Sequence, residues 1–88
     1  MALRRIPAFL TLPGPGEATF QIRIQMVKNS VLEAADTLAD FDSDTRTIRL
    51  PRGAKRDKRI YLFLHEMGHA LRDYEHFLAQ ELSEKRAE

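Results

Sequence analysis

Residues 60–71 read IYLFLHEMGHAL, and this stretch decides how the second half of the chain folds. Apolar residues recur in it and beyond it at steps of three and four, the spacing of one face of an α-helix. The members of this stripe are Ile60, Phe63, Leu64, Met67, Leu71, Tyr74 and Leu78. Asp57 is the expected N-cap, because its carboxylate can accept hydrogen bonds from the free amides of the first turn. We therefore expect a long helix whose apolar stripe covers a sheet.

The residues ahead of this helix have the patterns of short strands. From Thr19 to Val27, apolar and polar side chains alternate, which is the period of a half-buried strand. The passage from Val31 to Ala39 fits either one or two helical turns or an irregular link. After it, LADF and RTIRL flank the turn-rich DSDT, which indicates a hairpin that ends at Pro51.

Length and composition favour a single small domain. The chain has 88 residues, 43% of them hydrophobic, and can enclose only one modest core. We expect one α+β domain over 1–88, with an N-terminal arm at 1–18, a β-section at 19–52 and a helical section at 54–88. Its sheet is expected to be small, mostly antiparallel and covered by one long helix, with a short C-terminal helix as a further option. Metal binding or a homodimer would supplement so small a core.

Composition also excludes several classes of protein. There is no cysteine, so disulfides and thiolate ligands are excluded, and any metal must be bound by His, Asp or Glu. The longest apolar run, Ile60 to Leu64, is far shorter than the roughly 20 residues of a membrane span. Pro7 and Pro13 interrupt the apolar patch near the start, which does not fit a signal peptide. The expected location is the cytoplasm, without membrane contact.

Two histidines on the helix point away from its apolar stripe. His65 and His69 lie four residues apart, so both imidazoles share one helix face and can converge on one tetrahedral ion. Glu66 is about 100° round the helix from His65, where its carboxylate can reach a metal-bound water. Gly68 costs a helix about 1 kcal/mol relative to alanine, and with Ala70 it leaves room for an approaching molecule. The pattern predicts a Zn²⁺ site in which Glu66 takes a proton from the water.

The same residues resemble a known family. IYLFLHEMGHAL is similar to the active-site helix of zincin metallopeptidases, and FDSDTRTIRLP resembles the preceding hairpin of minimal, phage-type zincins and of the ImmA/IrrE family. The resemblance covers about Leu38 to Leu71 and rests mainly on the HExxH pattern. It implies zinc bound by His65 and His69, Glu66 as the general base, and hydrolysis of a peptide or protein substrate. It also implies that the strand before the helix is the sheet edge with which an extended substrate pairs.

The third protein ligand that zincins use stays open. HEMGHALRDYEH is similar to the metzincin pattern HExxHxxGxxH, but it has Arg72 in place of the glycine and a histidine one residue late. On a straight helix His76 would lie about 10 Å along the axis from His69. A turn between Arg72 and Glu75 is therefore required. The order of preference is His76, then Glu75, then the later glutamates Glu81, Glu84 and Glu88, with no ligand from this chain as the remaining alternative.

Two other functions stay open beside the peptidase. In the first, the scaffold is a protein-binding or regulatory module with weak or no hydrolysis, since so short a chain has little material for a water-excluding cleft. In the second, the basic segment 46–59 binds nucleic acid by neutralising phosphates. This function is less favoured because exposed aromatics for base stacking are missing there. The basic residues are Arg46, Arg49, Arg52, Lys55, Arg56, Lys58 and Arg59.

Overall fold

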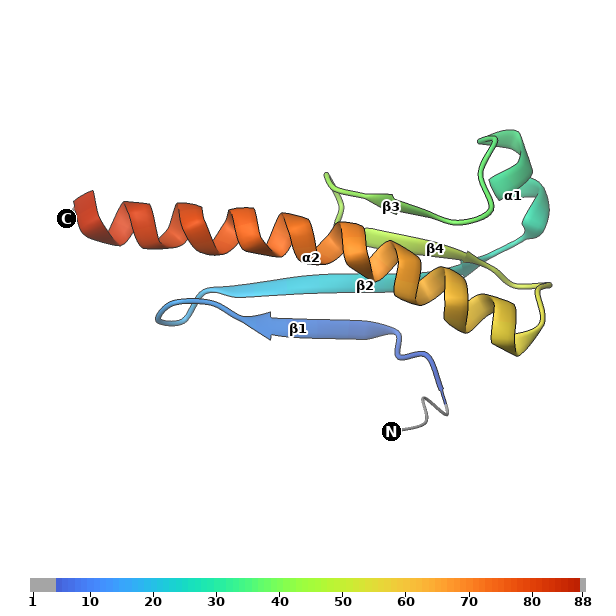
Figure 1. The fold of residues 1–88 in the computed structure, drawn as a ribbon, viewed down its shortest axis with the longest axis horizontal. Coiled ribbons are helices and arrows are strands. Elements are labelled where there is room, and N and C mark those ends of the chain that lie inside the picture. Colours follow the sequence, from blue (N-terminus) through green and yellow to red (C-terminus); the bar gives the residue numbers. More distant parts are fainter. Residues whose placement is uncertain (1–4, 88) are drawn as a thin grey trace.

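One long helix lies across one face of a four-stranded sheet (Figure 1). The computed structural model describes the chain from residue 5 to residue 87, and its side chains from residue 5 to residue 84. The elements are β1 (Phe9–Pro13), β2 (Thr19–Val27), α1 (Asn29–Ala34), β3 (Asp40–Asp42), β4 (Thr47–Pro51) and α2 (Arg56–Ala87). This arrangement confirms the α+β class and the long helix over a sheet.

The sheet has the strand order β1-β2-β4-β3. β1 pairs with β2 and β3 pairs with β4 in antiparallel fashion, whereas β2 and β4 are parallel. The expected mostly antiparallel sheet and the hairpin before the helix are therefore both present. The expectation that the strand before the helix forms the sheet edge is wrong, because β4 lies between β2 and β3. The free edge next to the hairpin belongs to β3.

The expected N-terminal arm contains a strand that the sequence pattern did not indicate. β1 pairs with β2 so that Leu10 lies opposite Ile22 and Leu12 opposite Phe20. Pro13 is compatible with this strand because β1 is at the sheet edge, where a missing amide donor breaks no ladder bond. The turn that follows is closed by the Gly14 amide, which donates to the Ala18 carbonyl at 2.9 Å.

The core lies between α2 and the face of the sheet that the alternation in β2 predicted. Phe20, Ile22 and Ile24 are buried on this face, together with Ile48 and Leu50 of β4. The other sheet face is polar. Arg49 and Asp40 lie opposite each other there and form a two-bond ion pair, in which Arg49 Nε donates to Asp40 Oδ1 at 2.7 Å.

Helix α1 and its C-terminal cap direct the chain toward β3. The amides of Asp36 and Thr37 donate to the carbonyls of Glu33 and Leu32, both at 3.0 Å, which is the hydrogen-bond pattern of a Schellman cap. Asp36 takes the left-handed position of this cap, with φ of 54°, a conformation that Asp tolerates better than most residues. Leu32 is buried and anchors the helix. The chain then runs from Thr37 to Ala39 along the flank of α2.

Helix α2 begins at Arg56, two residues before the start that an N-cap at Asp57 predicts, and it continues beyond residues 72–75. Asp57 lies in its first turn, where a negative charge is favourable, and is therefore not the N-cap. The helix is continuous to Ala87, so the chain makes no turn between Arg72 and Glu75 and, within residues 5–87, forms no separate final helix. None of the helices described there is long and apolar enough to cross a membrane.

The buried face of α2 differs from the predicted stripe. Leu64 and Leu71 are 60% and 44% exposed, whereas Leu62 and Ala70, which are not members of the stripe, are buried. Ala70 therefore leaves no room for an approaching molecule, because its methyl group faces the core. The stripe was misplaced because α2 has apolar residues on more than one face, and periodicity alone does not tell which of them meets the sheet.

Candidate metal centre

His65 and His69 are exposed on one face of α2, as the four-residue spacing predicted. Their ring centroids lie 5.4 Å apart, with the ring planes at 74°. The ring of Tyr61, one turn earlier, lies 6.5 Å from that of His65 at an interplanar angle of 28°. The two imidazoles are thus neighbours at the surface, with an aromatic side chain beside the first.

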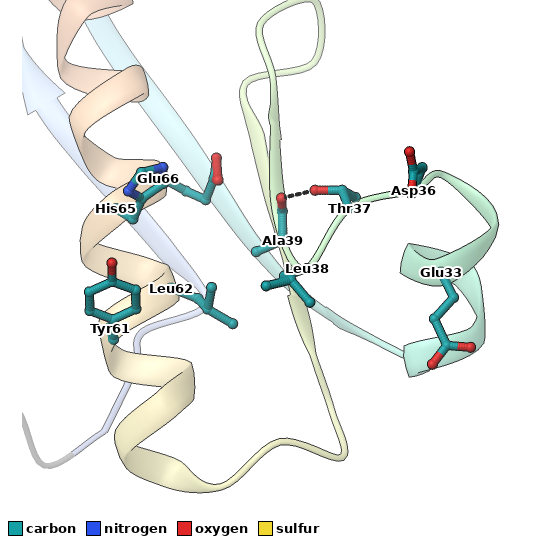
Figure 2. A pocket seen from close by; sticks show the side chains of 9 residues that line it. All are labelled: Glu33, Asp36, Thr37, Leu38, Ala39, Tyr61, Leu62, His65 and Glu66. Atoms are coloured by element: carbon teal, nitrogen blue, oxygen red, sulfur yellow. Dashed lines mark hydrogen bonds between the residues drawn. The ribbon is translucent and has the colours of Figure 1, made fainter.

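Glu66 lies between this histidine pair and the sheet edge. Its side chain is only 7% exposed, and Figure 2 shows it extending from α2 toward Ala39. One ligand atom from each of His65, Glu66 and His69 can be chosen so that all three lie within 4.8 Å of one another. In the described part of the chain, no hydrogen-bond or ion-pair partner contacts the Glu66 carboxylate. Its carboxylate oxygens are not fully buried, so the charged end of this side chain is open to solvent and to a cation.

A groove runs past these three residues, with α2 as one wall and the segment from α1 to β3 as the other. One cavity, of about 660 Å³, opens beside His65, and a second, of about 360 Å³, opens beside His69. The two cavities share Glu66 and Ala39. The opposite wall is braced by Thr37, whose hydroxyl donates to the Ala39 carbonyl (Figure 2). The short chain therefore does build a groove with walls on both sides.

The donor set fits a divalent transition-metal ion. Two imidazoles and one carboxylate are common zinc ligands, and here they come from a single turn of one helix, which holds their relative positions. His65 and His69 would hold the metal from the exposed side. Glu66 is close enough to both to serve either as a third ligand or as a base beside the metal.

His76 does not join this group. α2 is straight through residues 72–75, so His76 lies about 10 Å further along the axis than His69, and it is exposed there. His76 could be a ligand only if the chain turned between Arg72 and Glu75. This turn is absent, because the residues after Gly68 are all compatible with a helix. Glu75 is exposed on the same continuous helix, and Glu81 and Glu84 lie still further along it. Glu88 is outside the described residues.

Comparison with known proteins found no matching family model, no matching curated protein and no matching solved structure. The candidate metal centre is therefore defined by its own residues and their arrangement.

Several residues of the groove were not predicted from the sequence. Tyr61 precedes His65 by four residues, so the helical spacing that paired the histidines also places Tyr61 on their face. Glu33, Asp36 and Leu38 line the cavity on the opposite wall (Figure 2). Glu33 lies in α1, whereas Asp36 and Leu38 follow it in the link to β3, and the path of this link brings all three to α2.

At least three of the seven basic residues in segment 46–59 make contacts within the fold. The Arg46 guanidinium lies 4.1 Å from the centre of the Phe20 ring, and Arg52 donates to the Met26 carbonyl at 3.4 Å. Arg49 is paired with Asp40, and its hydrogen bond to that carboxylate raises the pKa of Arg49 above its ordinary value. Three of the arginines are thus engaged within the fold, which weakens the nucleic-acid interpretation.

Proposed function

We propose that this protein is a zinc-dependent metallopeptidase in which His65 and His69 bind Zn²⁺ and Glu66 is the general base. One observation carries the proposal. Glu66 is largely buried and has no partner among the described residues, although its carboxylate lies within 4.8 Å of ligand atoms of both exposed histidines. Three potential ligand atoms therefore converge at one place on the helix, and two imidazoles with one carboxylate are a donor set that zinc binds.

Each residue of the centre has a defined task in this proposal. Bound zinc acts as a Lewis acid that makes water nucleophilic near neutral pH. Glu66 accepts a proton from the attacking water and returns it to the leaving amine. The free edge of β3 and the preceding Ala39 offer main-chain groups with which an extended substrate can pair, directly opposite Glu66. Because the chain has no cysteine, the proposed location is the cytoplasm.

The test combines zinc content with turnover. We expect zinc to co-purify with the chain, and we expect Glu66→Gln to lower the cleavage of an unstructured protein by about 10²-fold or more, as loss of a general base does. Glu75→Gln is the matched control, since Glu75 is exposed on the same helix. Protein that contains no metal and gains no thermal stability from added Zn²⁺ would contradict the proposal.

A second candidate function is a zinc-binding scaffold that recognises proteins without cleaving them. It is favoured by the straight course of α2, which brings none of His76, Glu75, Glu81 or Glu84 to the centre. Bound zinc together with equal, negligible turnover in the parent protein and Glu66→Gln would support this function over hydrolysis.

A further inference from the structure

The cavity beside His65 combines apolar and acidic walls. On the α2 side, Tyr61 and Leu62 line it, and Leu38 lines it from the opposite wall (Figure 2). Tyr61 and Leu38 are 68% and 66% exposed, so both can contact a molecule that enters the cavity. This pair forms an apolar passage that leads from the candidate metal centre toward α1.

Beyond this passage the charge of the cavity is negative. Glu33 and Asp36 line the wall formed by α1 and its cap, and no Lys or Arg lines the cavity. Neither carboxylate has an ion-pair partner among the described residues. Glu66 would offset one of the two charges of a Zn²⁺ ion bound by two neutral imidazoles, which leaves one positive charge at the centre, and the negative charge of the cavity lies on its far wall at Glu33 and Asp36.

The two carboxylates are not equivalent. Glu33 also lines a neighbouring cavity of about 350 Å³, and Lys55 and Lys58 line that cavity with it. Asp36 is not part of that second cavity. Asp36 is therefore the less compensated of the two charges, and it should contribute more to the attraction of a cation.

We propose that this cavity selects an extended peptide with an arginine or lysine side chain next to the candidate metal centre. The aliphatic stem of that side chain would lie between Tyr61 and Leu38, and its cationic head would be attracted by Asp36 and Glu33, whose carboxylates point in opposite directions from the far wall (Figure 2). Both carboxylates are exposed, so a purely apolar side chain gains no attraction from them, and an acidic one is repelled. Arginine is favoured over lysine because its guanidinium can stack on the Tyr61 ring and bind a carboxylate through two hydrogen bonds.

This specificity rests on the proposed function, but binding can test it without any cleavage. The probe is a short fluorescent peptide of extended sequence with arginine at each position in turn, compared with citrulline, which has the same shape and no charge. Anisotropy is measured at low salt on the parent protein after its metal has been removed with a chelator, so that Glu66 is retained and no cleavage occurs. The arginine peptide that binds best should bind about five- to ten-fold more tightly than the peptide with citrulline at the same position. This difference in affinity is the one expected of one or two partly exposed ion pairs.

Charge-removing variants locate the effect. Asp36→Asn preserves the left-handed cap position, which Asn also tolerates. We expect it, combined with Glu33→Gln, to bring the arginine and citrulline peptides to within about two-fold of each other. Glu17→Gln is the matched control, because Glu17 is exposed in the turn between β1 and β2. Circular dichroism checks that each variant is folded.

The outcomes separate the two proposals. Equal binding of the arginine and citrulline peptides by the metal-free parent protein overturns the specificity, whether or not the zinc-loaded protein cleaves substrates. A preference that survives removal of both carboxylates also overturns it. A charge-dependent preference in a protein with no turnover supports the groove specificity and contradicts only hydrolysis.

Discussion

Glu66 shows how one residue can belong both to a core face and to a reactive site. On α2 it lies one turn from Leu62 and Ala70, both buried, and beside the exposed His65. The HExxH spacing predicted its proximity to the histidines. Its burial was not predicted, because the sequence does not show that the sheet meets α2 on the side of Leu62 and Ala70. Although the residue is mostly buried, it lines both cavities of the groove, so a cation held by the histidines would contact its carboxylate.

The histidines can be tested one at a time. We expect His65→Ala and His69→Ala each to abolish the thermal stabilisation that Zn²⁺ gives the parent protein, because each removes one of two exposed ligands. His76→Ala is the control, and it should retain the stabilisation because His76 lies about 10 Å further along the same helix. Differential scanning fluorimetry with and without Zn²⁺ measures this. Loss of the effect in His76→Ala would return His76 to the ligand set.

Gly68 can be tested for a structural cost. A Cβ added at Gly68 would have no heavy atom within 4 Å beyond the glycine's chain neighbours and the helix's own nearby backbone. Gly68→Ala should therefore raise the free energy of unfolding by about 0.5–1 kcal/mol through helix propensity alone. Urea denaturation measures the change. We expect zinc binding to be unaffected, and a variant that gained stability but bound Zn²⁺ more weakly would show that open backbone at this position is needed at the centre.

At the scale of elements, the sequence pattern predicted the strands that have a strict period or clear turn residues. It did not predict a strand whose formation depends on pairing with a neighbouring strand. β2 has the predicted bounds because its alternation is unbroken, and the β3–β4 hairpin follows from its turn residues. β1 was missed because Pro7 and Pro13 are strand breakers in isolation, although Pro13 is acceptable at a sheet edge. The groove was not predicted either. Much of its far wall comes from residues 36–39, whose sequence has no helical or strand period and therefore does not show where they lie.

The orientation of α2 provides a direct contrast between sequence pattern and structure. The predicted stripe contains Leu71 and not Ala70, yet Ala70 is fully buried and Leu71 is 44% exposed. Ala70→Leu should destabilise the protein by about 1–3 kcal/mol, because a larger side chain would be forced against the sheet. Leu71→Ala should change stability by about 0.5 kcal/mol or less. Chemical denaturation of both variants measures the two changes in stability. A larger loss of stability in Leu71→Ala than in Ala70→Leu would mean that α2 is rotated about its axis.

At the scale of the whole molecule, the long axis is set by α2. Its 32 residues span about 48 Å at 1.5 Å per residue, close to the 49 Å longest extent of the fold. Figure 1 shows the C-terminal part of the helix projecting past the turn between β1 and β2. The N-terminal half of α2 carries the candidate metal centre. Tyr74 and Phe77, further along the helix, pack against the hairpin formed by β1 and β2.

These contacts bring the C-terminal part of α2 against the β1–β2 hairpin, which is near the other end of the sequence. Tyr74 donates a hydrogen bond to the Pro13 carbonyl, and the rings of Tyr74 and Phe77 lie 5.5 and 5.4 Å from that of Phe20. The ring of Phe77 lies so close to Gly14 that a Cβ there would come within 2.8 Å of it. The aromatic cluster and the metal centre are separate regions of one helix, so their contributions to stability should be independent.

Phe77→Ala tests this independence. The substitution removes the ring contacts with Phe20 and Tyr74, and we expect it to lower the free energy of unfolding by about 2–4 kcal/mol, somewhat less than for a fully buried phenylalanine. Added Zn²⁺ should still stabilise the variant by the same increment as the parent protein, because His65, Glu66 and His69 lie within one turn of α2 and do not contact Phe77. Denaturation curves of both proteins with and without Zn²⁺ give the two increments. A zinc increment that vanished in Phe77→Ala would mean that the metal centre depends on how the far part of α2 is held against the first hairpin, and not on one helical turn.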